Sequence, residues 1–160
     1  MLTYRFLLFA AAAVLASQAQ GSEVASPVLG KWTNGRISMI QYKDAYTGVY
    51  KPPSGSHFAY EFRQDGTYTF IGLMQNTMYN CTTAMFSQET GTYEVNGDSV
   101  SLHPQKNPYR MTNNCAPSSN REAPGKLIER TYRYKVSSNG RLELISPQDA
   151  SVQAFQRSAE

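Results

Sequence analysis

Three short turn sequences, each with Gly beside Asn or Asp, divide this chain into pairs of alternating segments. They are Gln64-Asp65-Gly66, Asn96-Gly97-Asp98 and Ser138-Asn139-Gly140. Asn, Asp and Gly accept the positive φ angles that tight hairpin turns need. The three turns therefore predict three β-hairpins. In an up-and-down arrangement, all three turns lie at the same end of the sheet.

The segments beside these turns alternate with the period of two that is typical of β-strands, and no long segment carries a helical stripe. Phe58, Tyr60 and Phe62 share one face, and Tyr68 and Phe70 are in phase on the next segment. We expect eight strands, at about 31–42, 58–63, 67–74, 91–95, 99–103, 127–136, 141–146 and 151–156.

The remaining connections are mostly long, at about 43–56, 75–88 and 104–126, with a short exception at 147–150. In a meander they fall at the end opposite the tight turns. Closure of the sheet removes its unpaired edges. The sequence thus predicts an all-β, eight-stranded antiparallel up-and-down barrel with one closed end and one long-looped open end. An interior of this size is filled by side chains or holds one small ligand.

The two cysteines support this arrangement. Cys81 lies in the second long connection and Cys115 in the third, so both are expected at the open end. An even pair of cysteines in an exported protein usually forms a disulfide. We therefore predict a Cys81–Cys115 bond that restrains these loops.

The first 19 residues are expected to be a cleaved secretory signal, which leaves 20–160 as a single domain. An apolar run from Phe6 to Ala16 follows a weakly positive start, and Ser17-Gln18-Ala19 offers small residues for cleavage. No second stretch is long enough to span a membrane. The prediction is an exported, periplasmic or secreted monomer.

Charge excludes one class of partner. The chain has 15 Lys and Arg against 12 Asp and Glu, and the basic residues are scattered. This balance does not predict a nucleic-acid interface.

No motif for catalysis, metal binding or a cofactor stands out, so we expect neither an enzyme nor a cofactor. His57 and His103 both fall near the expected open end. Two histidines without a carboxylate motif are weak evidence for a metal. We interpret them as rim or surface residues.

Arg130 lies in the phase of Tyr132 and Tyr134. If that phase points inward, Arg130 enters the barrel and needs a carboxylate or a bound anion, such as a ligand head group. If the phase shifts near the start of the strand, Arg130 lies at the rim, which is the interpretation we favour. The candidate barrel lining that binds a ligand is Phe58, Tyr60, Phe62, Tyr68, Phe70, Arg130, Tyr132 and Tyr134.

Five further tyrosines, Tyr42, Tyr46, Tyr50, Tyr79 and Tyr109, fall in or beside the long connections. Tyrosine offers a large contact area with one polar group, as at many binding surfaces. These residues are expected at the open end, either around a ligand or partner or in loops that pack on themselves.

A resemblance to a known group rests on three residues. Gly30 and Trp32 open the first strand as Gly-x-Trp, and Arg157 follows the last strand. With the eight-stranded meander, this resembles the lipocalin and calycin group. The resemblance implies that Trp32 closes the barrel floor and packs against Arg157. The other lipocalin motifs and the family's usual disulfide are not found here, which favours a lipocalin-like bacterial export over a true lipocalin.

The expected function is non-catalytic binding of a small apolar or amphipathic ligand at the open end. The alternative is a protein-binding barrel, such as a periplasmic protease inhibitor, that uses the disulfide-tied loops and an envelope protein as partner. A barrel interior filled solidly by the lining aromatics would count against a ligand held inside it.

Overall fold

The computed structural model describes residues 26–37, 42–43, 50–51 and 54–158. No helix in this part of the chain is long and apolar enough to cross a membrane. The described residues form one short 3-10 helix, η1 (Pro117–Ser119), and the following strands: β1 (Gly30–Ile37), β2 (Tyr42–Lys43), β3 (Tyr50–Lys51), β4 (Gly55–Phe62), β5 (Thr67–Met78), β6 (Cys81–Asn96), β7 (Ser99–Lys106), β8 (Pro108–Asn113), β9 (Arg121–Pro124), β10 (Arg130–Val136), β11 (Arg141–Ile145) and β12 (Val152–Arg157).

Eight of these strands close into an antiparallel barrel. Around the ring the order is β1, β4, β5, β6, β7, β10, β11 and β12, and β12 pairs again with β1. Neighbours in the ring follow one another in the chain, which makes the barrel up-and-down. The predicted all-β, eight-stranded antiparallel barrel is therefore confirmed.

The three tight turns lie together at one end. Gly66, Gly97 and Gly140 all have positive φ, as hairpin turns of this kind require. Backbone hydrogen bonds link the turns to neighbouring strands, from Tyr93 N to Gly66 O and from Arg157 N to Gly140 O, each 2.8 Å long. This end of the barrel is closed by its own backbone.

Trp32 fills the floor at this closed end. Its side chain is fully buried, and the indole Nε1 donates a hydrogen bond to the carbonyl of Val28 at 2.7 Å. The Arg157 guanidinium carbon lies 4.4 Å from the centre of the indole, in cation–π geometry. Gly30 has a φ of +111°, and a Cβ there would lie 2.9 Å from Arg157 Nη1. A glycine is therefore required at this position.

The buried core lies against Trp32 inside the barrel. Four of its aromatic members come from β4, β5 and β12, and its aliphatic members come from the N-terminal segment, β7 and β11. The core consists of Val28, Trp32, Tyr60, Phe62, Tyr68, Val100, Leu102, Tyr132, Leu142, Leu144 and Phe155.

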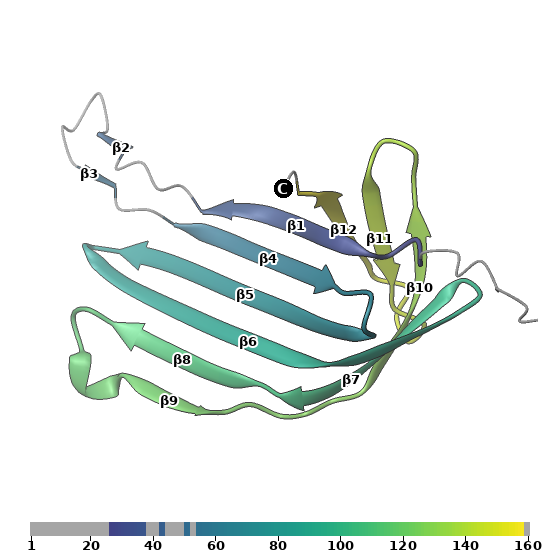
Figure 1. Ribbon diagram of the computed structural model, residues 1–160. Helices are drawn as coiled ribbons and strands as arrows, with labels where there is room; N and C mark the ends of the chain where they lie inside the picture. Colours follow the sequence, from purple (N-terminus) through teal and green to yellow (C-terminus); the bar gives the residue numbers. More distant parts are fainter. Residues whose placement is uncertain (1–25, 38–41, 44–49, 52–53, 159–160) are drawn as a thin grey trace, which may run out of the picture.

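At the open end, two of the predicted long connections, 75–88 and 104–126, are largely strands, so the prediction of loops there is wrong. Most of the third, 43–56, lies outside the described residues. β5 and β6 continue past the barrel to Met78 and Cys81, and pair with each other along their whole length. β8 and β9 then extend the sheet beside the outer half of β6. Figure 1 shows β1, β4, β5, β6 and β8 as one long sheet that projects away from the short strands β10, β11 and β12.

The physical reason lies in the composition of 73–90. This stretch contains several Thr residues and no Gly or Pro, so nothing interrupts the ladder. Its polar side chains suit a sheet whose faces both meet solvent. The tight turn comes instead at Tyr79 and Asn80, which both have positive φ.

One strand boundary differs from the prediction, and part of the first expected strand lies outside the described residues. β1 is described only to Ile37, and 38–41 and Tyr46 lie outside the described residues, as do Pro52 and Pro53. The strand expected at 127–136 begins at Arg130, and Ile128 before it is exposed. β10 pairs with β7 only over Arg130–Arg133, so the residues before Arg130 have no partner strand there.

We predict that Trp32→Ala destabilises the barrel by about 3–5 kcal/mol, because it leaves a large cavity in the floor. Arg157→Ala should cost less, about 0.5–2 kcal/mol, because it removes only the cation–π cover. Urea unfolding followed by far-UV circular dichroism measures both. Equal losses of unfolding free energy in the two variants would contradict the assignment of Trp32 as the floor and Arg157 as its cover.

Candidate functional site

The predicted lining aromatics form a packed stack across β4 and β5. Tyr60 is central: its ring centre lies 5.5 Å from that of Phe62, 4.7 Å from that of Phe70 and 5.3 Å from that of Phe155. Tyr60 and Phe62 are buried. These aromatics therefore form the core of the barrel, and the part of the interior around Tyr60 is filled by side chains.

Phe58 and Phe70 mark the upper limit of this packing. Their rings are stacked with centres 6.2 Å apart, and both side chains are partly buried. Of the predicted lining residues on β10, Tyr132 is buried in the core, whereas Tyr134 is partly buried near the turns and donates to Gly97 O. The eight predicted lining residues thus divide between core and rim.

A buried ionic cluster lies just above the aromatic core. Glu89 on β6 is 2% exposed, and its Oε1 accepts a hydrogen bond from the hydroxyl of Tyr68 at 2.7 Å. The same oxygen is paired with Nη2 of Arg130. A buried carboxylate needs such partners, because an unpaired charge in the interior is strongly unfavourable.

Arg130 therefore points into the barrel, and the interpretation that placed it at the rim is wrong. Its in-phase neighbour Tyr132 is buried, which shows that the alternation holds up to the start of β10. The carboxylate partner that an inward arginine requires is supplied by Glu89. Glu89 was missed because the strand was expected to begin at Gly91; Glu89 is two residues earlier and in the same phase.

Burial also determines the state of the neighbouring phenols. It raises the pKa of Tyr60 far above its ordinary value; the nearby carboxylate of Glu89 acts in the same direction, and the guanidinium of Arg130 opposes it. Burial and the hydrogen bond to Glu89 similarly raise the pKa of Tyr68. Both hydroxyls stay protonated at physiological pH, so the cluster contains neutral donors beside one ion pair.

The mouth of the barrel holds a cavity of about 600 Å³ next to this cluster. It is lined by Arg130 and Tyr132 from β10, by the loop between β11 and β12, and by Gln153. Nε of Arg130 is buried and has no hydrogen-bond partner.

A second hollow lies farther out, on the concave face of the long sheet. This face continues the inward phase of Phe70 through Met74 on β5, Met85 on β6 and Met111 on β8. The three methionines, with Asn76, Thr83 and residues 54–56, line a groove of about 700 Å³. Met74 and Met85 are both exposed. The concave face thus presents exposed methionines among polar side chains.

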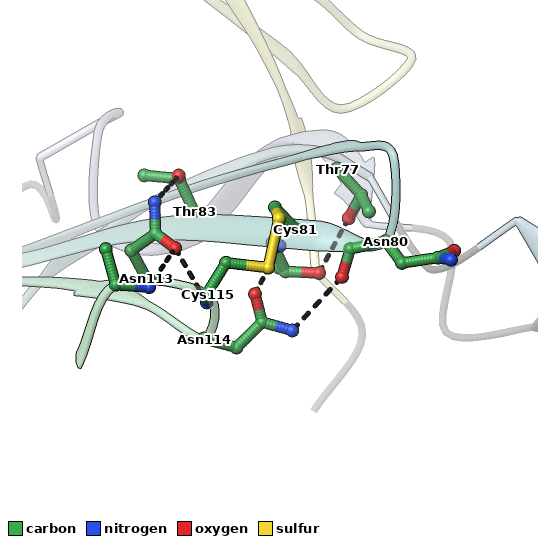
Figure 2. Close-up of a disulfide and its surroundings, with 9 residues drawn as sticks. Thr77, Asn80, Cys81, Thr83, Asn113, Asn114 and Cys115 are labelled. Atoms are coloured by element: carbon green, nitrogen blue, oxygen red, sulfur yellow. Dashed lines mark hydrogen bonds between the residues drawn. A yellow bond between two sulfur atoms is a disulfide. The ribbon is translucent and has the colours of Figure 1, made fainter.

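The tip of the β5–β6 hairpin is fastened to the β8–η1 segment. The predicted disulfide between Cys81 and Cys115 is confirmed. Asn114 adds two hydrogen bonds: its Nδ2 donates to Asn80 O at 3.2 Å, and its Oδ1 accepts from Thr82 N at 2.7 Å (Figure 2). The hairpin tip is therefore held by both covalent and polar contacts.

This fastened tip presents Tyr79 to solvent, with its side chain 95% exposed. Tyr109 is partly buried on β8, and the guanidinium of Arg121 lies 5.9 Å from its ring centre. Tyr42 and Tyr50 belong to β2 and β3, whose side chains lie outside the described residues. Among the described tyrosines predicted for the open end, Tyr79 is thus the fully exposed one.

The two histidines do not share a site. His57 on β4 faces outward, opposite in phase to Phe58, and His103 on β7 is opposite in phase to buried Leu102. β5 and β6 lie between these strands. His103 Nδ1 lies 3.2 Å from Glu129 Oε1. In the described part of the chain, no group of three or more His, Cys, Asp or Glu is arranged to hold a metal.

We predict that Glu89→Leu lowers the free energy of unfolding by about 3–5 kcal/mol, because it leaves the Arg130 charge unpaired inside the barrel. The double variant Glu89→Leu with Arg130→Met removes both charges and should recover most of this loss. Urea unfolding of the single and double variants measures the difference. A double variant no more stable than Glu89→Leu alone would contradict the pairing.

Replacing both cysteines with serine should lower stability by about 4 kcal/mol at most, because the bond closes a loop across 34 positions of the chain. Hydrogen exchange should show lost protection at Thr82 and Asn114, with core amides such as Leu102 protected in the same rank order as before. A uniform loss of protection from hydrogen exchange across the barrel would argue against a local role for the disulfide.

The architecture on which these sites stand is an eight-stranded antiparallel barrel, compatible with a lipocalin-like barrel. No protein-family model matches the chain, and no curated protein matches its sequence.

Proposed function

We propose that this chain is an exported lipocalin-like barrel that binds a small apolar or amphipathic ligand at its open end, without catalysis. The observation that carries the proposal is the concave face above the core. It is hollowed and accessible, and three methionines line it beside the polar side chains of Gln75, Asn76 and Thr83. The ligand lies outside the aromatic core and against the long sheet.

The size of the hollow supports this proposal. The groove of about 700 Å³ and the mouth cavity of about 600 Å³ both fall within the range of small-molecule sites. Methionine suits such a surface because its flexible, polarizable side chain adapts to ligands of different shape. A ligand that covers Met74 and Met85 removes their exposed apolar area from water, which supplies the driving force.

An amphipathic ligand is favoured by the polar groups beside the apolar face. Asn76 and Thr83 border the methionines in the groove, and Arg130 lines the mouth cavity. Polar groups beside apolar side chains are typical of sites that orient a ligand.

Export and family are part of the same proposal. The N-terminal sequence has the layout of a secretory signal, and the disulfide suits an oxidising compartment. The Gly30–Trp32–Arg157 arrangement at the floor matches what a lipocalin-like barrel implies.

A second candidate function is protein binding through the hairpin tip. It is favoured by Tyr79, which is almost fully exposed on a turn fastened by the disulfide and by Asn114. A rigid, exposed tyrosine is typical of the anchors at protein interfaces. An envelope protein is the kind of partner this tip fits.

A neutral apolar dye, N-phenyl-1-naphthylamine, tests the ligand proposal. Met85→Glu should weaken dye binding by about tenfold or more, because a buried methionine contact is worth about 1.5–3 kcal/mol. Phe86→Glu is the matched control: Phe86 is the next residue of β6, is 36% exposed against 38% for Met85, and faces the other side of the sheet. Fluorescence titration measures both.

Equal effects of the two substitutions, or no dye binding by the wild type, would contradict a ligand site on the concave face. Tyr79→Ala should leave dye binding unchanged. If native mass spectrometry of the protein recovered from its producing cells shows a protein partner that Tyr79→Ala releases, the second candidate replaces the first.

A further inference from the structure

Methionine has an uneven distribution in this fold. The buried core is built from aromatic residues, Leu and Val. The four methionines within the described ranges, Met74, Met78, Met85 and Met111, all lie on β5, β6 and β8, and all occupy the phase of the concave face. The outward positions of the same strands carry other apolar residues, such as Leu73. Among the described residues, the methionines thus lie on one face of one sheet.

Three of these methionines form a single row across neighbouring strands. Met85 is directly opposite Met74 on β5 and directly opposite Met111 on β8. Residues opposite each other in antiparallel strands have Cβ atoms about 4.5–5.5 Å apart. Because methionine has three flexible torsions, the three sulfur atoms can converge above β6. All three side chains line the same groove, where solvent reaches them.

Three converging thioethers make a metal site that prefers soft cations. Thioether sulfur is soft and uncharged, and it selects Cu(I), whereas carboxylates and imidazoles suit harder cations. The two cysteines are joined in a disulfide, so they do not compete as thiolates. We propose that the row Met74–Met85–Met111 is a Cu(I) site, in which the three sulfur atoms bind one ion within the groove.

The positive charge beside the row discriminates against divalent cations. Arg121 on β9 is directly opposite Met111, and its guanidinium lies over the ring of Tyr109. Repulsion from this positive charge grows with the charge of the bound ion. A monovalent soft cation is therefore penalised less than Zn(II) or Cu(II). This argument does not depend on the ligand function proposed above, although both use the same groove.

The test uses the mature chain with its disulfide intact. Ag(I) serves as a redox-inert probe with the charge and softness of Cu(I), and Cu(I) itself is supplied as its bicinchoninate complex in anaerobic ascorbate. We expect one equivalent of either ion by native mass spectrometry, and an all-sulfur first shell by X-ray absorption. Zn(II) should bind far more weakly. Tighter binding of Zn(II), or a shell of nitrogen and oxygen, would overturn the proposal.

Substitution by leucine assigns the binding to this row. Met74→Leu, Met85→Leu and Met111→Leu together conserve volume and apolar character, so the fold should persist, as circular dichroism of the metal-free protein checks. Removing a group that only supports a metal ligand already lowers metal affinity by roughly tenfold or more. The triple variant removes the ligands themselves, so its affinity for Ag(I) should fall by well over tenfold. Met78→Leu removes a thioether four residues farther along β5 and should retain the wild-type affinity.

The outcomes separate this proposal from the ligand function. The triple variant should still bind N-phenyl-1-naphthylamine, because leucine keeps the groove apolar. Loss of Ag(I) binding with retained dye binding supports the metal site. Unchanged Ag(I) affinity in the triple variant, or an equal loss in Met78→Leu, overturns it and leaves the ligand function standing.

Discussion

The packing of Trp32 against the barrel floor decides how the interior of this barrel is filled. The indole is fully buried, held by a hydrogen bond to Val28 and covered by Arg157. Tyr60 and Phe62 continue this packing upward from the floor. The base of the barrel interior is therefore filled by side chains. Trp32 on β1, with Tyr60 and Phe62, thus occupies the space that a ligand would take in a hollow barrel.

Much of the barrel could be predicted because its strands obey simple local rules. The turns at Gly66, Gly97 and Gly140 carry the glycine that positive φ demands, and the segments beside them alternate cleanly. The disulfide followed from the placement of Cys81 and Cys115 at one end. These features depend on neighbours in sequence, which is why alternation and turn chemistry were sufficient.

The extension was harder to predict because its strands do not bury a face. Polar residues dominate 75–88, and its few large apolar residues do not recur at every second position, so this stretch resembles a loop when judged by hydrophobic pattern alone. What makes it a sheet is pairing between distant segments, as at Met85 and Met111. Glu89 was missed for the same reason: its role depends on Arg130, 41 residues away in the chain.

β6 connects these two regions. Its second half closes the barrel against β7, and its first half carries Met85 and the disulfide at Cys81. Glu89 lies between them, where β6 leaves the core, and its pairing with Arg130 joins β6 to β10 across the barrel interior. An ion pair at this point favours one register of β6, because a slip by one residue would turn the carboxylate outward and leave Arg130 unpaired. The same register places Met85 between Met74 and Met111, so the row of sulfur atoms depends on an ion pair that it does not touch.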